Sequence, residues 1–494
     1  MEKNNFTIES GETSDLFLPI EEMEQQLKKY LEENPSDMEE KAIGVVKTLH
    51  NKGYETYFAG GSVRDFLLGK KISDIDIATS ATPDEIKKIF KKVSSGGNME
   101  KYGSIRVHKG NHEFEVTTFR IEKGYKDKRR PDKVIFTSAE KDATRRDFTI
   151  NGLFYDPLSY KVIDFVDGLS DLDNKVLRFI GDPNQRIEED NLRLLRAIRF
   201  KNKFGLKYDE ETWQSVVKNA DLIKNVSAER IRDELTKMLM DGSRVFSLSD
   251  ISESGLLKEI LPEIENLKDI EQPENFHTEG DAWNHTLLSL KVIDDNFIKE
   301  TEDEFGTKIK ISPTLIWAVL LHDVGKPRSQ RLPEKDKVER ITFHGHEKIG
   351  SEIASKVLKS LRFSNDDFEH ITWLIGNHMR IINLPQMREA KQKKFFLEPW
   401  FSDLLFLHKV DTQSSLPVNL DLYNQTLKLF LEAQKQPKVD VKGILNGDDL
   451  KKIGISEGPK IGRILSKIEE EILEGKIKTK DEAFKRANDF SKES

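Results

Sequence analysis

Hydrophobic and polar positions divide the chain into a first part that mixes strand and helix patterns and a longer part that is helical. Residues 54–180 carry short runs of alternating polarity, typical of strands with one face in a core, between short helical patterns. From Asn184 onward, apolar residues recur with helical spacing and few strand signals remain. We therefore predict an α+β fold, in which a head with a small mixed β-sheet is followed by an all-α region.

Five strands are predicted in the head, each as a short run of apolar and β-branched residues. They are Glu55–Ala59, Ile75–Ala78, Ile105–His108, Glu113–Phe119 and Val162–Val166. A helix from Met38 to Gly53 precedes the first strand. Residues 1–37 are polar apart from one amphipathic piece, Ile20–Leu31.

Changes of pattern predict five parts of the chain. They are an N-terminal extension (1–37), the head (38–180), a helical neck (181–270), a histidine-rich helical domain (271–433) and a helical tail (434–494). The last boundary follows from QKQPK at residues 434–438, where a proline and polar side chains break the helical pattern.

Composition narrows the class of protein. The chain has no cysteine, which excludes disulfides and thiolate metal sites and fits a reducing compartment. No apolar run follows a basic start, and no segment approaches the ~18 apolar residues that span a bilayer. The net charge of −8 argues against indiscriminate nucleic-acid binding. We predict a cytoplasmic protein without a membrane partner, and its oligomeric state stays open.

Residues 57–79, YFAGGSVRDFLLGKKISDIDIAT, combine a glycine pair with two aspartates. Gly60 and Gly61 allow the backbone to approach a phosphate, and the helix that starts at Ser62 offers N–H donors. Asp74 and Asp76 are two apart on the next predicted strand, so they would share one face. Two close carboxylates repel each other, and divalent cations relieve that repulsion. A lone D-x-D is more often a solvated turn, but joined to the glycine motif it predicts two-metal phosphoryl or nucleotidyl transfer.

Further motifs follow this one in order. They read EFEVTTFR (113–120), ATRRDFTINGL (143–153), IEEDNLRLLRAIRF (187–200) and SAERIRDEL (227–235). The ordered set resembles the class II tRNA nucleotidyltransferase and poly(A) polymerase family, from about Tyr54 to Leu235 and on to about Gly475. The resemblance implies an enzyme that adds C, C and A to the 3′ end of tRNA from CTP and ATP. An A-adding enzyme and a bacterial poly(A) polymerase remain alternatives, because they share the head motifs.

The resemblance also implies roles for residues of the head. The Mg²⁺ ligands and catalytic carboxylates would be Asp74, Asp76 and Glu115. Contacts to the nucleotide would come from Gly60, Gly61, Ser62, Arg64, Arg146, Asp147, Asn151, Glu189, Asp190, Arg193 and Arg196. For Arg64, a weak ion pair with Asp65 on a helix surface is the competing interpretation.

Asp190 and Arg193 suggest how bases are selected. On one helix they would share a face, with Glu189 orienting Arg193 as its i+4 partner. A carboxylate only accepts hydrogen bonds and a guanidinium only donates them. Cytosine and adenine both offer an amino donor beside a ring-nitrogen acceptor, whereas guanine and uracil present the opposite pattern. The pair could therefore select C and A without a nucleic-acid template, although such charge runs are more often solvated helix faces.

The segment GYKDKRRPDKVIF, residues 124–136, is predicted to be a mobile loop because of its glycine, proline and charges. In the family, a loop at this place helps the pocket switch from C to A. Its full length here disfavours an enzyme that adds C alone.

Eight of the eleven histidines lie after residue 270. His285, the pair His322-Asp323 and Asp411 follow the order H…HD…D, which resembles the HD superfamily of metal-dependent phosphohydrolases. The resemblance implies that these four side chains bind a transition metal such as Ni²⁺. His346 and His378 match positions that hold a second metal in some relatives. A protein of another class is thus an alternative: an HD phosphohydrolase that uses the head to bind RNA.

Overall fold

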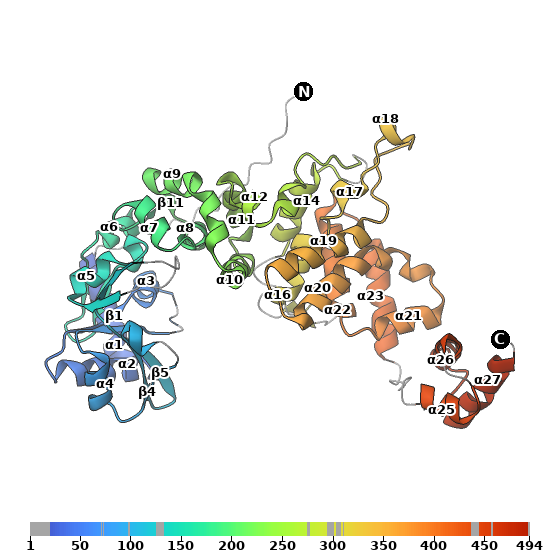
Figure 1. The fold of residues 1–494 in the computed structure, drawn as a ribbon, viewed down its shortest axis with the longest axis horizontal. Helices are drawn as coiled ribbons and strands as arrows, with labels where there is room; N and C mark the ends of the chain where they lie inside the picture. Colours follow the sequence, from blue (N-terminus) through green and yellow to red (C-terminus); the bar gives the residue numbers. More distant parts are fainter. Residues whose placement is uncertain are drawn as a thin grey trace. The chain divides into compact units, whose positions relative to one another are not determined.

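A computed structural model describes residues 20–70, 72, 74–96, 99–124, 133–273, 277–293, 301–302, 308–309, 311–435, 444–455 and 458–492. The chain forms two compact units, Met1–Val226 and Ser227–Ser494 (Figure 1). The division falls inside the predicted neck. The five-part domain organisation stays a prediction.

A seven-stranded sheet, in the order β3-β4-β5-β2-β1-β8-β9, forms the centre of the first unit. Its strands are β1 (Thr56–Ala59), β2 (Ile77–Thr79), β3 (Val93–Ser94), β4 (Ser104–Lys109), β5 (His112–Thr118), β8 (Phe154–Asp156) and β9 (Lys161–Ile163). Strands β2 and β5 pair in parallel, and the other described pairs of this sheet are antiparallel. The predicted mixed sheet is therefore confirmed.

Helices cover both faces of this sheet. The helices and short 3-10 turns of the head are α1 (Ile20–Glu33), α2 (Asp37–His50), α3 (Gly61–Leu67), α4 (Pro83–Ile89), η1 (Glu100–Tyr102), α5 (Ala139–Thr144), η2 (Thr149–Asn151) and α6 (Gly168–Asp173). Helix α2 buries Val45, Val46 and Leu49 against β1, β2 and β5. On the opposite face, Phe119 and Phe154 pack with α5 in a second apolar cluster. The central sheet is thus packed against helices on both of its faces.

One placement differs from the prediction. Asp74 and Asp76 were expected on a strand, but β2 begins only at Ile77. The ladder with β1 starts where Phe58 pairs with Ile77, and the last bond before it runs from Ala59 N to the Asp76 carbonyl oxygen at 3.0 Å. Both aspartates therefore lie in the segment that leads into the strand, at the end of the sheet.

A second difference concerns the helix predicted through residues 187–200. The structure has two helices instead, α7 (Pro183–Glu189) and α8 (Arg193–Lys203), and Asp190 between them is extended with φ −145° and ψ 104°. The Asn191 side chain donates to the Ile187 carbonyl at 2.6 Å, and Asp190 Oδ1 accepts from Leu192 N at 3.1 Å. These side-chain bonds to the backbone compete with the helical pattern. The argument that Asp190 and Arg193 share one helix face is therefore wrong.

The first unit ends with β10 (Val176–Leu177), β11 (Lys207–Tyr208), α9 (Glu210–Lys218) and η3 (Ala220–Asn225). Strands β10 and β11 pair in parallel, which is a small exception to the all-α prediction after Asn184. The short pair β12 (Thr301–Glu302) and β13 (Lys308–Ile309) in the second unit is another.

The second unit is otherwise helical where it is described. Its helices are α10 (Ala228–Leu239), α11 (Arg244–Glu253), α12 (Leu256–Ile260), α13 (Pro262–Glu265), α14 (Ala282–Lys291), α16 (Pro313–Leu321), α17 (Lys326–Ser329), α18 (Pro333–Asp336), α19 (His346–Ser360), α20 (Asn365–Asn377), η4 (His378–Gln386), α21 (Glu389–Phe396), α22 (Phe401–Ser414) and α23 (Asp421–Gln434). The apolar helix α16, which ends in the sequence LIWAVLL, is buried against α14, α20 and α22. None of the described helices has the length and apolar character that crossing a membrane requires.

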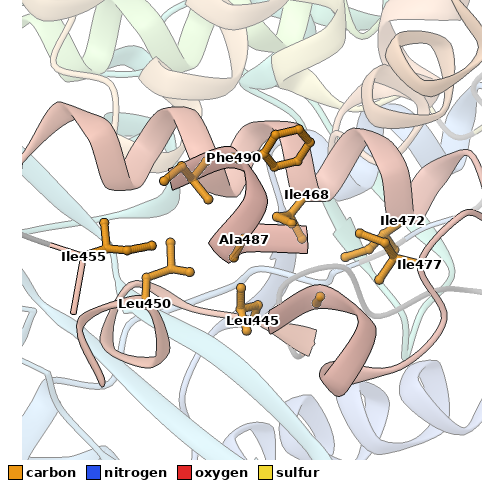
Figure 2. Packing of buried hydrophobic residues seen from close by; sticks show 10 residues of the cluster. Leu445, Leu450, Ile455, Ile468, Ile472, Ile477, Ala487 and Phe490 are labelled. Atoms are coloured by element: carbon orange, nitrogen blue, oxygen red, sulfur yellow. The ribbon is translucent and has the colours of Figure 1, made fainter. Parts of the chain in front are cut away.

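The tail has a hydrophobic core of its own. Its helices are α25 (Gly447–Lys452), α26 (Pro459–Leu473) and α27 (Lys480–Lys492). Figure 2 shows apolar side chains from all three segments gathered in one cluster, with Leu450, Ile468 and Phe490 among its buried members. The helical tail predicted from the sequence is therefore present.

Candidate functional sites

Three carboxylates gather at the end of the central sheet. The parallel pair Ile77↔Val116 brings the segment of Asp76 alongside Glu115 on β5. Asp74, Asp76 and Glu115 are all exposed to solvent. The pKa of Asp76 is raised to about 6, first by partial desolvation and then by the charges of Glu115 and Asp74, with Arg146 opposing the rise. The part of this rise that comes from the two neighbouring carboxylates is repulsion that a divalent cation would relieve.

These carboxylates fit a hard divalent cation, since they offer only oxygen ligands. Among the described residues, tight groups of metal-ligand atoms are found in the histidine-rich domain, so the three head carboxylates are spaced more loosely. The structure thus brings the three carboxylates near one another, as predicted from the sequence. Their oxygen atoms do not all lie within 4.8 Å of one another.

The glycine turn depends on Gly60 more than on Gly61. Gly60 has φ +71° and ψ −130°, and a Cβ there would lie 2.7 Å from Arg146 Nη1. Its N–H donates to the Leu153 carbonyl at 3.1 Å. Gly61 has no positive φ, and a Cβ on it would meet nothing nearer than Arg64 Nη2, at 3.5 Å. Of these two glycines, Gly60 is therefore the one whose backbone conformation requires glycine.

Four of the predicted nucleotide contacts are bonded to one another. Arg64 Nη1 donates to Asn151 Oδ1, and Asn151 Nδ2 donates to Asp147 Oδ1 at 2.9 Å. Arg196 Nε donates to Asp147 Oδ2 at 2.9 Å. Burial opposes ionisation of Asp147, but Arg196, Asn151 and Arg193 outweigh it and lower its pKa well below the usual range. The structure thus brings these side chains together as one polar network, in which Arg64, Asp147 and Asn151 are buried and Arg196 is partly exposed.

Arg64 is buried, with 5% of its surface exposed, and its guanidinium lies 4.2 Å from the centre of the Phe204 ring. It also pairs with Asp65, at 2.7 Å between Nη2 and Oδ1. The Arg64–Asp65 ion pair considered from the sequence is therefore present, but Arg64 is enclosed and not part of a helix surface. Ser62, also predicted at the phosphate, donates through Oγ to the Ala59 carbonyl at 3.0 Å.

Asp142 is a member of the site that the sequence analysis missed. Its side chain is 1% exposed, and it accepts from Arg145 Nε at 2.8 Å and from Arg146 Nη2 at 3.1 Å. It also accepts from Arg120 N at 3.0 Å. Its spacing of three and four residues from the two arginines that directly follow α5 was a usable signal. Asp142 thereby fixes Arg146 above the Gly60 turn.

The predicted pair of Glu189 and Arg193 is present, at 2.8 Å between Oε2 and Nη1. Arg193 also donates to the carbonyl oxygens of Arg186, at 2.8 Å, and Arg145, at 3.3 Å. Asp190 sits at the break between α7 and α8. The guanidinium of Arg193 is therefore held by three acceptors of the protein itself.

Strands β6 (Arg120–Lys123) and β7 (Lys133–Phe136) pair antiparallel, so the prediction of a loop is wrong for residues 133–136, which form a strand. Residues 125–132, the central part of the predicted loop, lie outside the described residues.

In the second unit, six predicted ligands converge from separate helices. They are His285 on α14, His322 and Asp323 at the end of α16, His346 at the start of α19, His378 at the start of η4 and Asp411 on α22. The four imidazoles are buried. Two sets of ligand atoms each lie within 4.8 Å of one another, namely His285, His322, Asp411 and Asp323, His346, His378.

Distances within this centre are short. His285 Nε2 lies 3.1 Å from Asp411 Oδ1, and His322 Nε2 lies 3.2 Å from Asp323 Oδ2. His346 Nε2 lies 3.5 Å from Asp323 Oδ1 and 3.0 Å from His378 Nε2. The nitrogens that face the centre are thus all Nε2.

The carboxylates and imidazoles of this centre shift one another's pKa values. Against the effect of burial, Asp323 and Asp411 raise the pKa of His322 to about 10, and Asp411 and Glu279 raise that of His285. Burial opposes the charge on Asp323 and Asp411, yet the neighbouring histidines hold both pKa values well below the usual range. Burial, followed by the other imidazoles, lowers the pKa of His378 to about 3 and that of His346 below its usual value. Ionised carboxylates and neutral imidazoles are the states that bind transition metals. The donor set therefore fits such a metal.

Two neighbours of this centre were not predicted. Lys326 is buried, and its Nζ lies 2.6 Å from Asp323 Oδ2 and 2.6 Å from Gln272 Oε1. Glu279 contacts His285 Nδ1 at 3.0 Å. Lys326 is visible in the sequence as the lysine three residues after Asp323, whereas Glu279 had no such signal.

Comparison with known proteins matches three parts of the chain to families. Residues 56–178 match the Poly A polymerase head domain, residues 205–268 the probable RNA and SrmB-binding site of polymerase A, and residues 303–399 the HD domain. The first and third domain types suggest dependence on divalent metal ions.

Relatives and solved structures agree with these matches. The chain is 39% identical over 269 residues to a CCA-adding enzyme of Lactobacillus helveticus, which covers 53% of this chain and 66% of that relative. It is 44% identical over 218 residues to a CCA-adding enzyme of Geobacillus sp., covering 44% and 53%. The matched part thus spans less than two thirds of the length of these curated relatives. The crystal structure of the Bacillus stearothermophilus CCA-adding enzyme in complex with CTP has the same fold, with a TM-score of 0.64 and 24% identity over 93% of this chain and 100% of that one.

Proposed function

Because the chain belongs to the family of class II tRNA nucleotidyltransferases and poly(A) polymerases, we propose that it adds C, C and A to the 3′ end of tRNA from CTP and ATP. The observation that carries this proposal is the cluster of Asp74, Asp76 and Glu115 beside the Gly60 turn. The names of the relatives favour CCA addition over A addition alone or poly(A) synthesis.

In this proposal, Asp74, Asp76 and Glu115 hold Mg²⁺. Two bound Mg²⁺ ions would supply activation of the RNA 3′-hydroxyl and charge stabilisation at the triphosphate. The protein's own contribution is orientation. Arg146, fixed by Asp142, carries positive charge beside the Gly60 turn, where the triphosphate would approach.

The nucleotide base would be read by Asp190 and Arg193. Glu189 and two backbone carbonyls hold the guanidinium of Arg193 in one orientation, which supports a fixed template. Because the helix breaks at Asp190, its carboxylate is placed by the extended segment and not by helical spacing. The network of Arg64, Asn151 and Asp147 connects the helix after the Gly60 turn to Arg196 on α8.

Three tRNA substrates test this function. Purified protein is given tRNA that lacks CCA, lacks only the terminal A, or is complete, each with labelled CTP and ATP. We expect C and A incorporation into the first, A alone into the second and none into the third. Incorporation of A without C would favour the A-adding alternative, and long A tracts would favour a poly(A) polymerase. A cytoplasmic location stays a prediction.

We also propose a second activity, hydrolysis of phosphoesters at the HD centre in the presence of a transition metal such as Ni²⁺. It is supported by the convergence of His285, His322, Asp323 and Asp411, with His346 and His378 as candidates for a second metal. His322→Ala combined with Asp323→Ala should abolish Ni²⁺-dependent hydrolysis of 2′,3′-cyclic phosphates, while nucleotide addition with Mg²⁺ continues. Hydrolysis that persists in this variant would refute the assignment.

A further inference from the structure

Glu279 is a buried carboxylate that contacts the HD centre without being one of its predicted ligands. It precedes α14, and its side chain is 2% exposed. Its Oε1 lies 2.6 Å from His277 Nδ1 and 3.0 Å from His285 Nδ1, and its Oε2 accepts from Leu416 N at 3.0 Å. An ionised carboxylate only accepts hydrogen bonds, so both Nδ1 atoms carry the proton.

His285 is oriented differently from the other three imidazoles of the centre. Those three donate Nδ1–H to backbone carbonyls three residues earlier: His322 to Val319 at 2.8 Å, His346 to Phe343 at 2.9 Å and His378 to Ile375 at 2.7 Å. At His285 the acceptor is the Glu279 side chain. Among these four imidazoles, His285 is thus the one whose orientation depends on a replaceable carboxylate.

With Nδ1 donating to Glu279, the nitrogen of His285 that can bind a metal is Nε2, which faces the centre and lies 3.1 Å from Asp411 Oδ1. A charged acceptor behind an imidazole fixes its tautomer and raises its basicity as a ligand. Glu279 also binds Leu416 N, two residues beyond the end of the helix that carries Asp411. It therefore connects the segments that hold two ligands.

We propose that Glu279 is a positioning residue of the HD centre, which presents His285 Nε2 to a divalent transition metal. This inference rests on the second proposed activity. His277, Glu279 and His285 also have the residue types of a separate metal site, with ligand atoms within 4.8 Å of one another. A metal at that place would have to displace the Nδ1 proton of His285 while Nε2 serves the HD centre. A hydrogen-bonded carboxylate avoids that ionisation of the ring.

Co²⁺ binding to the full chain tests the proposal. Asp74→Ala and Asp76→Ala are present throughout, so that the proposed head site does not contribute. The dissociation constant is measured by competition with a chelating dye, and the Co²⁺ absorption spectrum reports the ligand geometry. We expect Glu279→Gln to weaken Co²⁺ binding 10- to 100-fold and to alter the spectrum.

Two variants serve as controls. Asp403→Asn removes the carboxylate of another histidine pair in the same unit, His370 Nε2 to Asp403 Oδ2 at 2.9 Å, which includes no proposed ligand. His277→Ala keeps the bond between Glu279 and His285. Both variants should change the Co²⁺ dissociation constant of the parent chain by no more than about threefold. Loss of a hydrogen bond that orients a metal ligand weakens binding by roughly 10- to 100-fold, which is a clearly larger change. Thermal unfolding without metal checks that the variants are folded.

The outcomes separate the two proposals. Equal Co²⁺ affinity in Glu279→Gln and the parent, with binding lost in His322→Ala/Asp323→Ala, would overturn the role of Glu279 and leave the HD activity standing. A parent chain that binds no Co²⁺ would overturn both. If His277→Ala lost as much Co²⁺ binding as Glu279→Gln, the metal would be assigned to the group of His277, Glu279 and His285. The positioning role of Glu279 would then be overturned.

Discussion

Replacing Gly60 by alanine should damage the head far more than replacing its neighbour Gly61. Gly60 combines φ +71° with ψ −130°, a conformation that a residue with a Cβ rarely adopts and that costs about 1–3 kcal/mol. The added methyl would also lie 2.7 Å from Arg146 Nη1, so the guanidinium has to move.

That guanidinium is not free to move without loss. Arg146 donates to Asp142 from Nη2, at 3.1 Å, and to the Asn151 carbonyl from Nη1, at 3.3 Å. Breaking one hydrogen bond to a charged partner costs about 1.5–3 kcal/mol. Together with the backbone strain, Gly60→Ala should lower the free energy of unfolding of the head by about 2.5–6 kcal/mol.

Gly61→Ala is the matched control. Its Cβ would make an ordinary contact with Arg64, and alanine favours the helix that begins there by up to about 1 kcal/mol. The stability of both variants is measured by denaturant unfolding, which is monitored through the hydrogen exchange of peptides from residues 54–200. CTP incorporation into tRNA lacking CCA gives their activity, which we expect to fall at least tenfold in Gly60→Ala. Unfolding free energies of the two variants within about 0.5 kcal/mol of each other would refute the reasoning, since surface changes alone stay in that range.

Three other outcomes are expected. Asp74→Ala or Asp76→Ala should abolish both C and A addition, because both steps would use one metal pair; near-normal incorporation by a folded variant would contradict this. Asp190→Ala or Arg193→Ala should raise misincorporation of UTP and GTP, measured one nucleotide at a time, and unchanged selectivity would count against a protein template. Asp142 has a pKa below its usual 3.8, because its arginine partners outweigh the effect of burial. Its stabilising contribution is therefore complete above about pH 4 and is lost as the pH falls through the lowered pKa. Asp142→Asn should accordingly flatten the decline of head stability, measured by hydrogen exchange, between pH 5 and pH 2, and an unchanged slope would contradict the ion-pair account.

Much of the head could be predicted from local pattern. The strand that carries Glu115 lies between two neighbours in one sheet, so its side chains alternate between core and solvent. That alternation is visible in the sequence, which is why this strand could be predicted. The strand after Asp76 was placed too early, since its start is set by the length of its partner β1. A local pattern carries no information about where a distant partner strand ends.

The remaining errors also have physical causes. The run from Glu189 to Arg193 has the composition of a helix, but Asn191 satisfies the Ile187 carbonyl with its side chain and ends the helix there. In the HD centre the ligand types could be predicted because His322 and Asp323 are adjacent. Glu279 could not, because its partner Leu416 N is 137 residues away in sequence.

The order of the head residues along the chain sets a timetable for synthesis. The polar network closes through Arg196, which is 120 positions after Asp76 (196 minus 76), and a ribosome adds about 5–20 residues per second. Some 6–24 s therefore pass, at roughly those rates, between the emergence of the first carboxylates and that of the arginine that completes the pocket. During this interval Asp147, once it has been made, still lacks Arg196, so the polar network of the head is completed only after the first residues of the predicted neck have been synthesised.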